Sequence, residues 1–141
     1  LIEGLGFKIL VNESQNIIVN DATIMITGIP DRSGRHFSSF HKTDMEKAVG
    51  GMNSSDLKIL LAHQPGDVEH ATKYEFDLQL SGHTHGGQYF PFSLLVQMAH
   101  PFLKGLHKRE NTWVYINQGT GYWGPPLRIG TEPEITEIVL V

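Results

Sequence analysis

The sequence contains no cysteine. Disulfide bonds and thiolate metal sites such as zinc fingers are therefore excluded. Long hydrophobic runs are missing too, since none reaches the ~18 residues that a membrane-spanning helix needs. Hydrophobic residues make up 40% of the 141 residues and charged residues 18%, a balance typical of a globular protein. We expect one α/β domain over residues 1–141, because this length suffices for a hydrophobic core.

An excess of positive charge is also missing. The formal net charge is −4, and no basic run is longer than Lys108-Arg109. A nucleic-acid-binding protein usually presents a basic stripe or patch, so we expect no nucleic-acid partner. The chain opens Leu-Ile-Glu-Gly, without methionine or a basic leader, and we expect it to be a piece of a longer protein. The sequence does not indicate the cellular compartment of the protein.

Hydrophobic patterning predicts an antiparallel opening followed by an α/β unit. In this unit a strand, a helix over 67–73 and a second strand follow one another. A shorter helix over 43–49 is predicted from the capping pair Thr43 and Glu46. An Asn-Ser turn is expected over 12–16. The predicted strands span residues 6–11, 17–19, 23–27, 57–62, 76–80, 112–117, 127–129 and 135–141.

Residues 89–107 form a hydrophobic stretch that is interrupted by two prolines and one glycine. Two interpretations stay open. The favoured one is a helix in the core, because apolar stretches are usually buried. The other is an apolar flap beside the functional site that contacts lipid or an apolar substrate group. The second would give the intact protein a peripheral membrane contact.

Two histidines, His83 and His85, stand one residue apart in the glycine-flanked segment Gly-His-Thr-His-Gly-Gly. In extended backbone such positions point to the same side. A third histidine, His63, ends the strand predicted over 57–62, and neighbouring strands deliver functional side chains from their carboxyl ends. Imidazole is the commonest metal ligand in proteins. We therefore predict that these three histidines bind metal.

Other candidates have ordinary interpretations. Asp31 follows a predicted strand end, where a carboxylate takes part in chemistry or, as we favour, caps the next turn. Gly119 and Gly121 lack the third glycine and the following helix of a dinucleotide fingerprint. Five further histidines have no partner at ligand spacing and are interpreted as structural: His36, His41, His70, His100 and His107.

The segments LLAHQP (60–65) and LQLSGHTHGGQ (78–88) resemble the calcineurin-like metallophosphoesterases, in the branch that includes the YkuE and YaeI phosphoesterases. Further similarity lies in residues 6–12, 28–31 and 118–135. The resemblance runs nearly from end to end. It implies half of an α/β/β/α sandwich, mostly β-strands with a few short helices, and makes the chain the C-terminal part of a phosphoesterase domain.

The resemblance implies a centre with two divalent metal ions, for which Mn, Fe, Zn and Ni all accept the ligand types. By motif position, His63 and His83 would bind one ion and His85 the other, and the last two count as catalytic. The family's remaining ligands belong to three earlier motifs, Asp-x-His, Gly-Asp and Gly-Asn-His-Asp/Glu, none of which precedes His63 here. Arg128 is a candidate substrate ligand, because guanidinium binds phosphate oxygens; an ordinary surface arginine is the alternative.

Without the bridging carboxylate, two doubly charged ions ~4 Å apart repel by roughly 16 kcal/mol at an effective dielectric of about 20. We therefore expect the isolated chain to bind at most one metal ion and to have little or no activity. For the intact protein, the resemblance implies hydrolysis of phosphomonoesters or phosphodiesters, including phospholipid or nucleotide-lipid substrates. The alternative is a non-catalytic binding or scaffold domain with one or no metal. Half a sandwich exposes apolar surface, so we also expect self-association.

Overall fold

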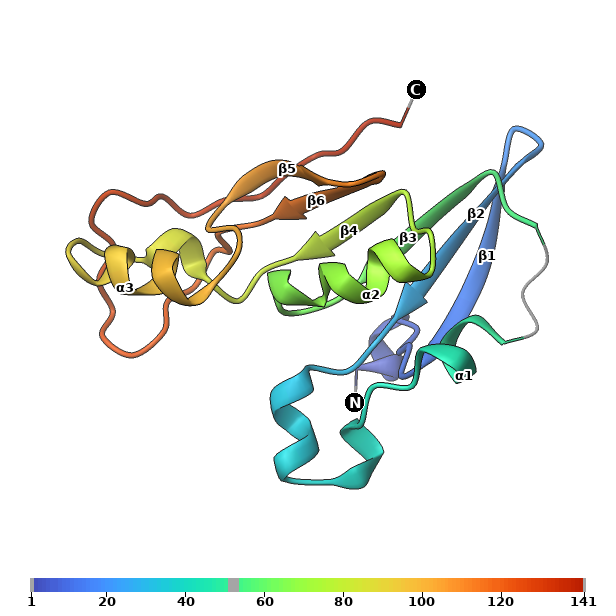
Figure 1. Cartoon of the computed structure of the whole chain (residues 1–141), viewed down its shortest axis with the longest axis horizontal. Helices are drawn as coiled ribbons and strands as arrows, with labels where there is room; N and C mark the ends of the chain where they lie inside the picture. Colours follow the sequence, from blue (N-terminus) through green and yellow to red (C-terminus); the bar gives the residue numbers. More distant parts are fainter. Residues whose placement is uncertain (1, 51–53, 141) are drawn as a thin grey trace.

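The computed structural model describes residues 2–50 and 54–140. In this part of the chain, six strands form one sheet in the order β1-β2-β3-β4-β6-β5 (Figure 1). The four central strands are parallel, and β1 and β5 pair antiparallel at the two edges. The strands are β1 (Glu13–Val19), β2 (Ala22–Gly28), β3 (Leu57–Leu61), β4 (Leu78–Ser81), β5 (Gly105–Arg109) and β6 (Thr112–Ile116).

The antiparallel opening is a hairpin of β1 and β2. Asn20 and Asp21 connect the strands with φ angles of 49° and 69°, as in the turns that match the twist of a hairpin. Pairing runs from Val19 back to Glu13, which lies opposite Gly28. The turn predicted over residues 12–16 is therefore wrong beyond residue 12, because cross-strand pairing outweighs the turn preference of the Asn and Ser side chains.

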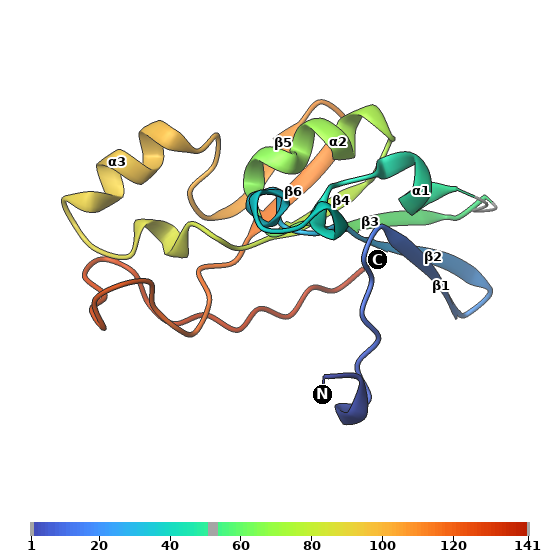
Figure 2. The same ribbon diagram turned by 90° about the horizontal axis from the view of Figure 1, so that it is seen from below.

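Two short helices, α1 (Met45–Val49) and α2 (Val68–Lys73), cover one face of the sheet (Figure 2). The α2 helix confirms the one predicted over 67–73. The N-cap of α1 is Asp44, one residue later than the predicted Thr43, because the side chain of Asp44 accepts a hydrogen bond from the backbone N–H of Lys47.

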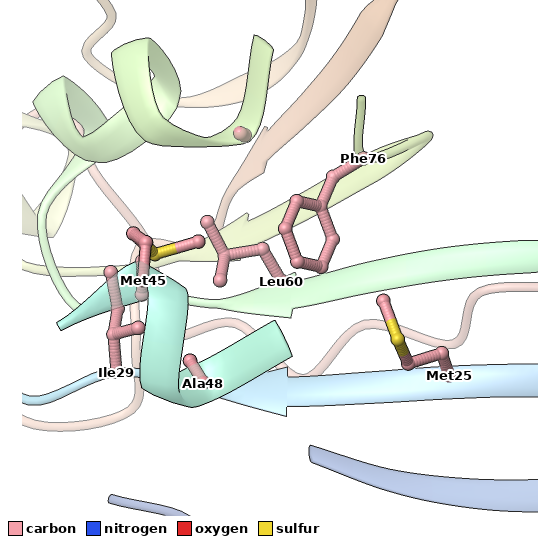
Figure 3. Packing of buried hydrophobic residues seen from close by; sticks show 8 residues of the cluster. Met25, Ile29, Met45, Ala48, Leu60 and Phe76 are labelled. Atoms are coloured by element: carbon pink, nitrogen blue, oxygen red, sulfur yellow. The ribbon is translucent and has the colours of Figure 1, made fainter. Parts of the chain in front are cut away.

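The main core lies between these helices and the sheet. Leu60 on β3 is fully buried, and Figure 3 shows it between Met45 of α1 and Phe76. The whole cluster consists of Met25, Ile29, Met45, Ala48, Leu60, Ala62, Ala71 and Phe76. This packing fixes β2 and β3 side by side and so sets the positions of the segments that follow them.

The opposite face of the sheet is apolar and only partly covered. Leu61, Trp113 and Leu106 lie on this face and are 38%, 44% and 58% exposed. The C-terminal segment runs along this side (Figure 2). The strands predicted over 6–11 and 135–141 do not form in the described residues, because these segments have no ladder partner. Residue 141 lies outside the described residues.

Most of the hydrophobic stretch over 89–107 lies outside the core, although Phe102 is partly buried against the second core cluster of Val68, Val114 and Ile116. Its first part forms α3 (Phe92–Ala99), which has no buried residue, and its last part contributes to β5. Leu94, Leu95 and Met98 are 54%, 61% and 85% exposed. The core interpretation is therefore wrong, because α3 follows the short η5 helix (His85–Gly87) beyond the end of the sheet (Figure 1). In the described residues no helix is long and apolar enough to span a membrane.

The short strand predicted over 127–129 is reduced to a single bridge between Tyr89 and Ile129. The strands predicted over 23–27, 57–62, 76–80 and 112–117 are present as β2, β3, β4 and β6, with slightly shifted ends. The predicted fold class is confirmed. A mixed sheet with short helices on one face corresponds to one half of an α/β/β/α sandwich.

Candidate metal centre

The candidate site lies where the parallel strands β3 and β4 end. His63 follows β3 by two residues, and His83 follows β4 by two. Hydrogen bonds hold the two strand ends together: the hydroxyl of Ser81 donates to the carbonyl of Ala62, at 2.7 Å. The N–H of Gly82 donates to the carbonyl of His63, at 3.1 Å. The two histidines are thus fixed side by side, as parallel strands ending at one edge require.

The rings of His63 and His83 contact each other. Nε2 of His63 lies 3.0 Å from Nδ1 of His83, and the rings meet edge to face with centroids 4.9 Å apart. A divalent ion held by two imidazole nitrogens at about 2.1 Å each, with an angle of roughly 90–110°, keeps these nitrogens about 3.0–3.4 Å apart. The pair therefore fits two ligands of one ion.

The environment favours the metal-binding form of the His83 ring. Burial, followed by the neighbouring rings of His63 and His100, lowers the pKa of His83 below its usual value. A neutral imidazole has the free lone pair that a metal ion requires. The lowered pKa of His83 and the spacing of the two rings point to the same chemistry.

The backbone around the pair is not extended. The prediction that His83 and His85 point to the same side of the chain had assumed extended backbone. His83, His85 and Gln88 have φ angles of 71°, 50° and 53°, in the left-handed region. Gly86 and Gly87 also lie there, and a Cβ on Gly87 would come within 2.5 Å of Ser93. Non-glycine residues in such conformations cost on the order of 1 kcal/mol each and cluster at functional sites.

His85 lines the same cavity, but its ring is directed differently. Nδ1 of His85 lies 3.4 Å from Nη2 of Arg128. Burial, followed by the charge of Arg128, lowers the pKa of His85. In residues 2–50 and 54–140, no three side chains of the histidine, aspartate and glutamate types are arranged around one point as a complete metal site. That His85 binds a second ion stays a prediction.

Arg128 ties a loop together. Its Nη2 donates to the carbonyl oxygens of Gln118 and Gly119 at 2.8 and 3.1 Å, and its Nε donates to that of Gly121 at 2.9 Å. These bonds hold the loop over 118–121 against His85. Substrate binding by Arg128 stays a prediction, and its observed partners are backbone carbonyls.

Asp31 faces the pair from the segment after β2. Its carboxylate caps the turn at Ser33, as expected, and also accepts a hydrogen bond from Gln64, at 2.6 Å. The second oxygen lies 3.8 Å from Nε2 of His63. Burial would raise the pKa of Asp31, but the hydrogen bonds from Ser33 and Gln64 and the nearby imidazole lower it. The site therefore has an ionised carboxylate beside the histidine pair.

A cavity of about 310 Å³ opens over the histidines. Sequence reasoning missed His100, whose ring centroid lies 5.0 Å from that of His83. No spacing signal identifies it, because it reaches the cavity from the C-terminal end of α3. The cavity is lined by His63, His83, Thr84, His85, Gln88, Phe92, Val96, His100 and Trp123.

No family model matches the chain, and no solved structure matches it. The chain is 40% identical over 99% of its length to "Transmembrane protein with metallophosphoesterase domain" of Danio rerio and covers 34% of that protein. It is 40% identical over 99% of its length to an uncharacterized metallophosphoesterase of Helicobacter pylori (strain ATCC 700392 / 26695), covering 37%.

The similarity extends to the branch that the motifs indicated. The chain is 31% identical over 96% of its length to the uncharacterized metallophosphoesterase YkuE of Bacillus subtilis (strain 168) and covers 47% of it. The chain thus spans about a third to a half of the length of these relatives. Over almost its whole length, the chain is therefore similar to the C-terminal part of proteins that are named metallophosphoesterases.

Proposed function

We propose that the intact protein hydrolyses phosphoesters with divalent metal ions, and that His63 and His83 bind one of these ions. The observation that carries the proposal is the 3.0 Å spacing of Nε2 of His63 and Nδ1 of His83 at the ends of two parallel strands. The names of the relatives, which cover almost the whole chain, support the same chemistry.

The chain's own groups have distinct roles in this proposal. A divalent ion bound here would neutralise phosphoryl charge and activate water for attack. His63 and His83 would hold the ion, and the carboxylate of Asp31, 3.8 Å from Nε2 of His63, would place a negative charge beside it. His85, next to the loop that Arg128 holds, faces the same cavity and is assigned to a second ion. The remaining ligands of a two-metal centre would come from the rest of the intact protein.

Metal binding by the chain tests the proposal. Titration with Mn²⁺ in a calorimeter should show binding of at most one ion, and His63→Ala or His83→Ala should weaken it by at least tenfold. His36→Ala is the matched control, because His36 is exposed and lies on another segment. Equal affinity in all variants would contradict the assignment.

Measurement of phosphoester hydrolysis tests the proposed activity of the intact protein. We expect the isolated chain to have little or no activity with bis-p-nitrophenyl phosphate, and the intact protein with Mn²⁺ to hydrolyse it. Activity of the isolated chain near that of the intact protein would contradict the proposal that the rest of the intact protein supplies metal ligands. Metal binding by the intact protein without turnover would favour the alternative of a non-catalytic scaffold domain.

Two of the relatives are named transmembrane proteins with a metallophosphoesterase domain. On this basis we infer that the intact protein is associated with a membrane. Fractionation of cells that express the intact protein tests this inference: recovery in the membrane pellet is expected, and recovery only in the soluble fraction would contradict it.

A further inference from the structure

The carboxylate of Glu134 joins the C-terminal segment to the loop that follows β6. Its Oε2 accepts hydrogen bonds from the backbone N–H and from the side-chain amide of Gln118, at 3.2 and 3.0 Å. The backbone N–H of Glu134 donates to the carbonyl of Gly119, at 3.0 Å. Hydrogen bonds to an ionised acceptor are stronger than those between neutral groups. The two consecutive residues of the loop are therefore held by one side chain and its own backbone.

The side chain of Gln118 packs against the segment that carries His85. A Cβ on Gly86 would lie 2.5 Å from Oε1 and 3.0 Å from Cγ of Gln118, so the approach depends on the missing side chain of this glycine. In residues 2–50 and 54–140, the buried Oε1 of Gln118 has no hydrogen-bond partner. The amide is thus oriented by its bond to Glu134, and it is fixed between that carboxylate and the histidine segment.

The Nδ1 edge of the His85 ring faces the same loop. Nη2 of Arg128 lies 2.8 Å from the carbonyl oxygen of Gln118 and 3.4 Å from Nδ1 of His85. A Cβ on Gly119 would lie 3.7 Å from this nitrogen. Burial and the charge of Arg128 lower the pKa of His85, whereas a hydrogen bond with the backbone of Gln118 raises it. A raised pKa is the effect expected when a ring N–H donates to a carbonyl oxygen.

The hydrogen bonds of Arg128 determine which ring nitrogen of His85 carries the proton. Nη2 has two N–H bonds to donate. Three carbonyl oxygens, those of Gln118, Gly119 and Gly121, lie within 3.1 Å of it. Nδ1 of His85, at 3.4 Å, is farther away than all three and receives no hydrogen from Nη2. The contacts therefore favour the tautomer in which Nδ1 is protonated and the lone pair is on Nε2, directed away from the loop.

We propose that Glu134 and Gln118 are positioning residues for His85. By fixing Gln118, the carboxylate holds the Gln118 carbonyl where the Nδ1–H of His85 donates to it, and Nε2 is left as the free nitrogen. The nitrogen of a histidine that binds metal is set by the hydrogen bond that the other nitrogen makes. The proposal rests on the proposed function only in assigning the free nitrogen to a metal ion.

The tautomer of His85 in the metal-free intact protein tests the proposal. Nitrogen-15 NMR of histidine-labelled protein distinguishes the two tautomers, and the signals of His85 are those lost in His85→Gln. We expect the Nδ1–H form in the wild type. Glu134→Gln and Gln118→Ala should each raise the fraction of the Nε2–H form at least threefold. The Nε2–H form in the wild type, or an unchanged tautomer in both variants, would overturn the proposal.

Thr136→Val is the matched control, because it weakens the same cluster without touching the loop. The hydroxyl of Thr136 bonds the carboxylate of Glu134 at 2.6 Å. It also bonds the side chains of Tyr115 and Asn117, at 2.8 and 3.0 Å. This variant should lower the stability and leave the tautomer of His85 unchanged. An equal change of tautomer in Thr136→Val and Glu134→Gln would overturn the proposal, because lost stability alone would then account for both.

Calorimetric titration of the intact protein with Mn²⁺ measures the consequence for metal binding. Glu134→Gln should weaken the binding of one ion by about tenfold or more and leave that of the other ion, assigned to His63 and His83, within threefold. Equal weakening of both ions, or of neither, would overturn the proposal. Absence of Mn²⁺ binding in the wild type would count against the proposed function, while the tautomer, measured without metal, still decides on the role of Glu134.

Discussion

At the scale of single residues, the site depends on how one ring nitrogen is oriented. Nε2 of His63 faces both His83 and the carboxylate of Asp31. The histidine pair follows from the sequence, because both residues come two positions after apolar strands. The direction of the His85 ring and the position of His100 do not, since they depend on left-handed backbone and on the placement of α3. Neither leaves a pattern in the sequence.

Replacing Asp31 by Asn should weaken Mn²⁺ binding by about tenfold or more with little change in stability, because it removes a negative charge close to Nε2 of His63. Asn keeps an oxygen that can accept the hydrogen bond from Ser33, so the turn remains capped. Only the charge beside His63 is removed. Calorimetric titration measures the effect, and Asp21→Asn, in the exposed β1–β2 turn, is the control. Unchanged affinity in Asp31→Asn would show that the carboxylate does not support the metal site.

Glu134 should make stability depend on pH in the acid range. Burial would raise its pKa, but hydrogen bonds outweigh this effect and lower the pKa from 4.5 to about 2. The stabilisation is therefore complete above the unfolded pKa near 4.5 and is lost as the pH falls toward 2. The carboxylate accepts these bonds from the side chains of Thr136, Tyr115 and Gln118 and from the backbone N–H of Gln118.

Urea denaturation at pH 7 and at pH 3 measures the contribution of Glu134. The substitution Glu134→Gln should lower stability at pH 7 and reduce the loss between the two pH values. The exposed Glu132 provides the control substitution, Glu132→Gln. If Glu134→Gln and wild type lose the same stability on acidification, the hydrogen-bonded carboxylate is not the cause.

At the scale of elements, hydrophobic patterns identify strands only where a neighbour is present to pair with them. The central strands β2, β3, β4 and β6 were predictable, because parallel strands covered by helices have long apolar runs. The apolar segments 6–11 and 135–140 have similar composition but no ladder partner, so they stay irregular. The strand β5 was missed, because its residues read as the end of the apolar stretch that contains α3.

The two faces of β3 differ in how strongly they stabilise the chain. Leu60 is fully buried under the helices, and Leu61 on the opposite face is 38% exposed. Leu60→Ala should lower the free energy of unfolding by about 2–5 kcal/mol, because it opens a cavity in the core. Leu61→Ala, in the same strand, should lower the free energy of unfolding by a clearly smaller amount. Urea denaturation measures both, and equal losses would contradict the assignment of the core to the helix face.

At the scale of the whole molecule, one layer of helices covers one sheet face and leaves the other open. The open face carries Leu61, Leu106 and Trp113, and large exposed apolar patches mark interfaces. The α/β class was predictable from the alternation of patterns. The extent to which the open face is covered was not predictable, because it depends on the path of the C-terminal segment.

The open face should make the isolated chain self-associate. Sedimentation velocity at increasing concentration should show species larger than a monomer, and Leu106→Lys should shift the distribution toward the monomer by placing a charge on this face. Phe37→Lys, at a position 90% exposed on another segment, should have no such effect. A clean monomer at all concentrations would contradict the prediction.

The most direct test of the metal centre is anomalous scattering from crystals of the protein grown with Mn²⁺. We expect a peak about 2.1–2.3 Å from both Nε2 of His63 and Nδ1 of His83. Absence of a peak at this pair, with the two rings still bonded to each other at 3.0 Å, would contradict the assignment.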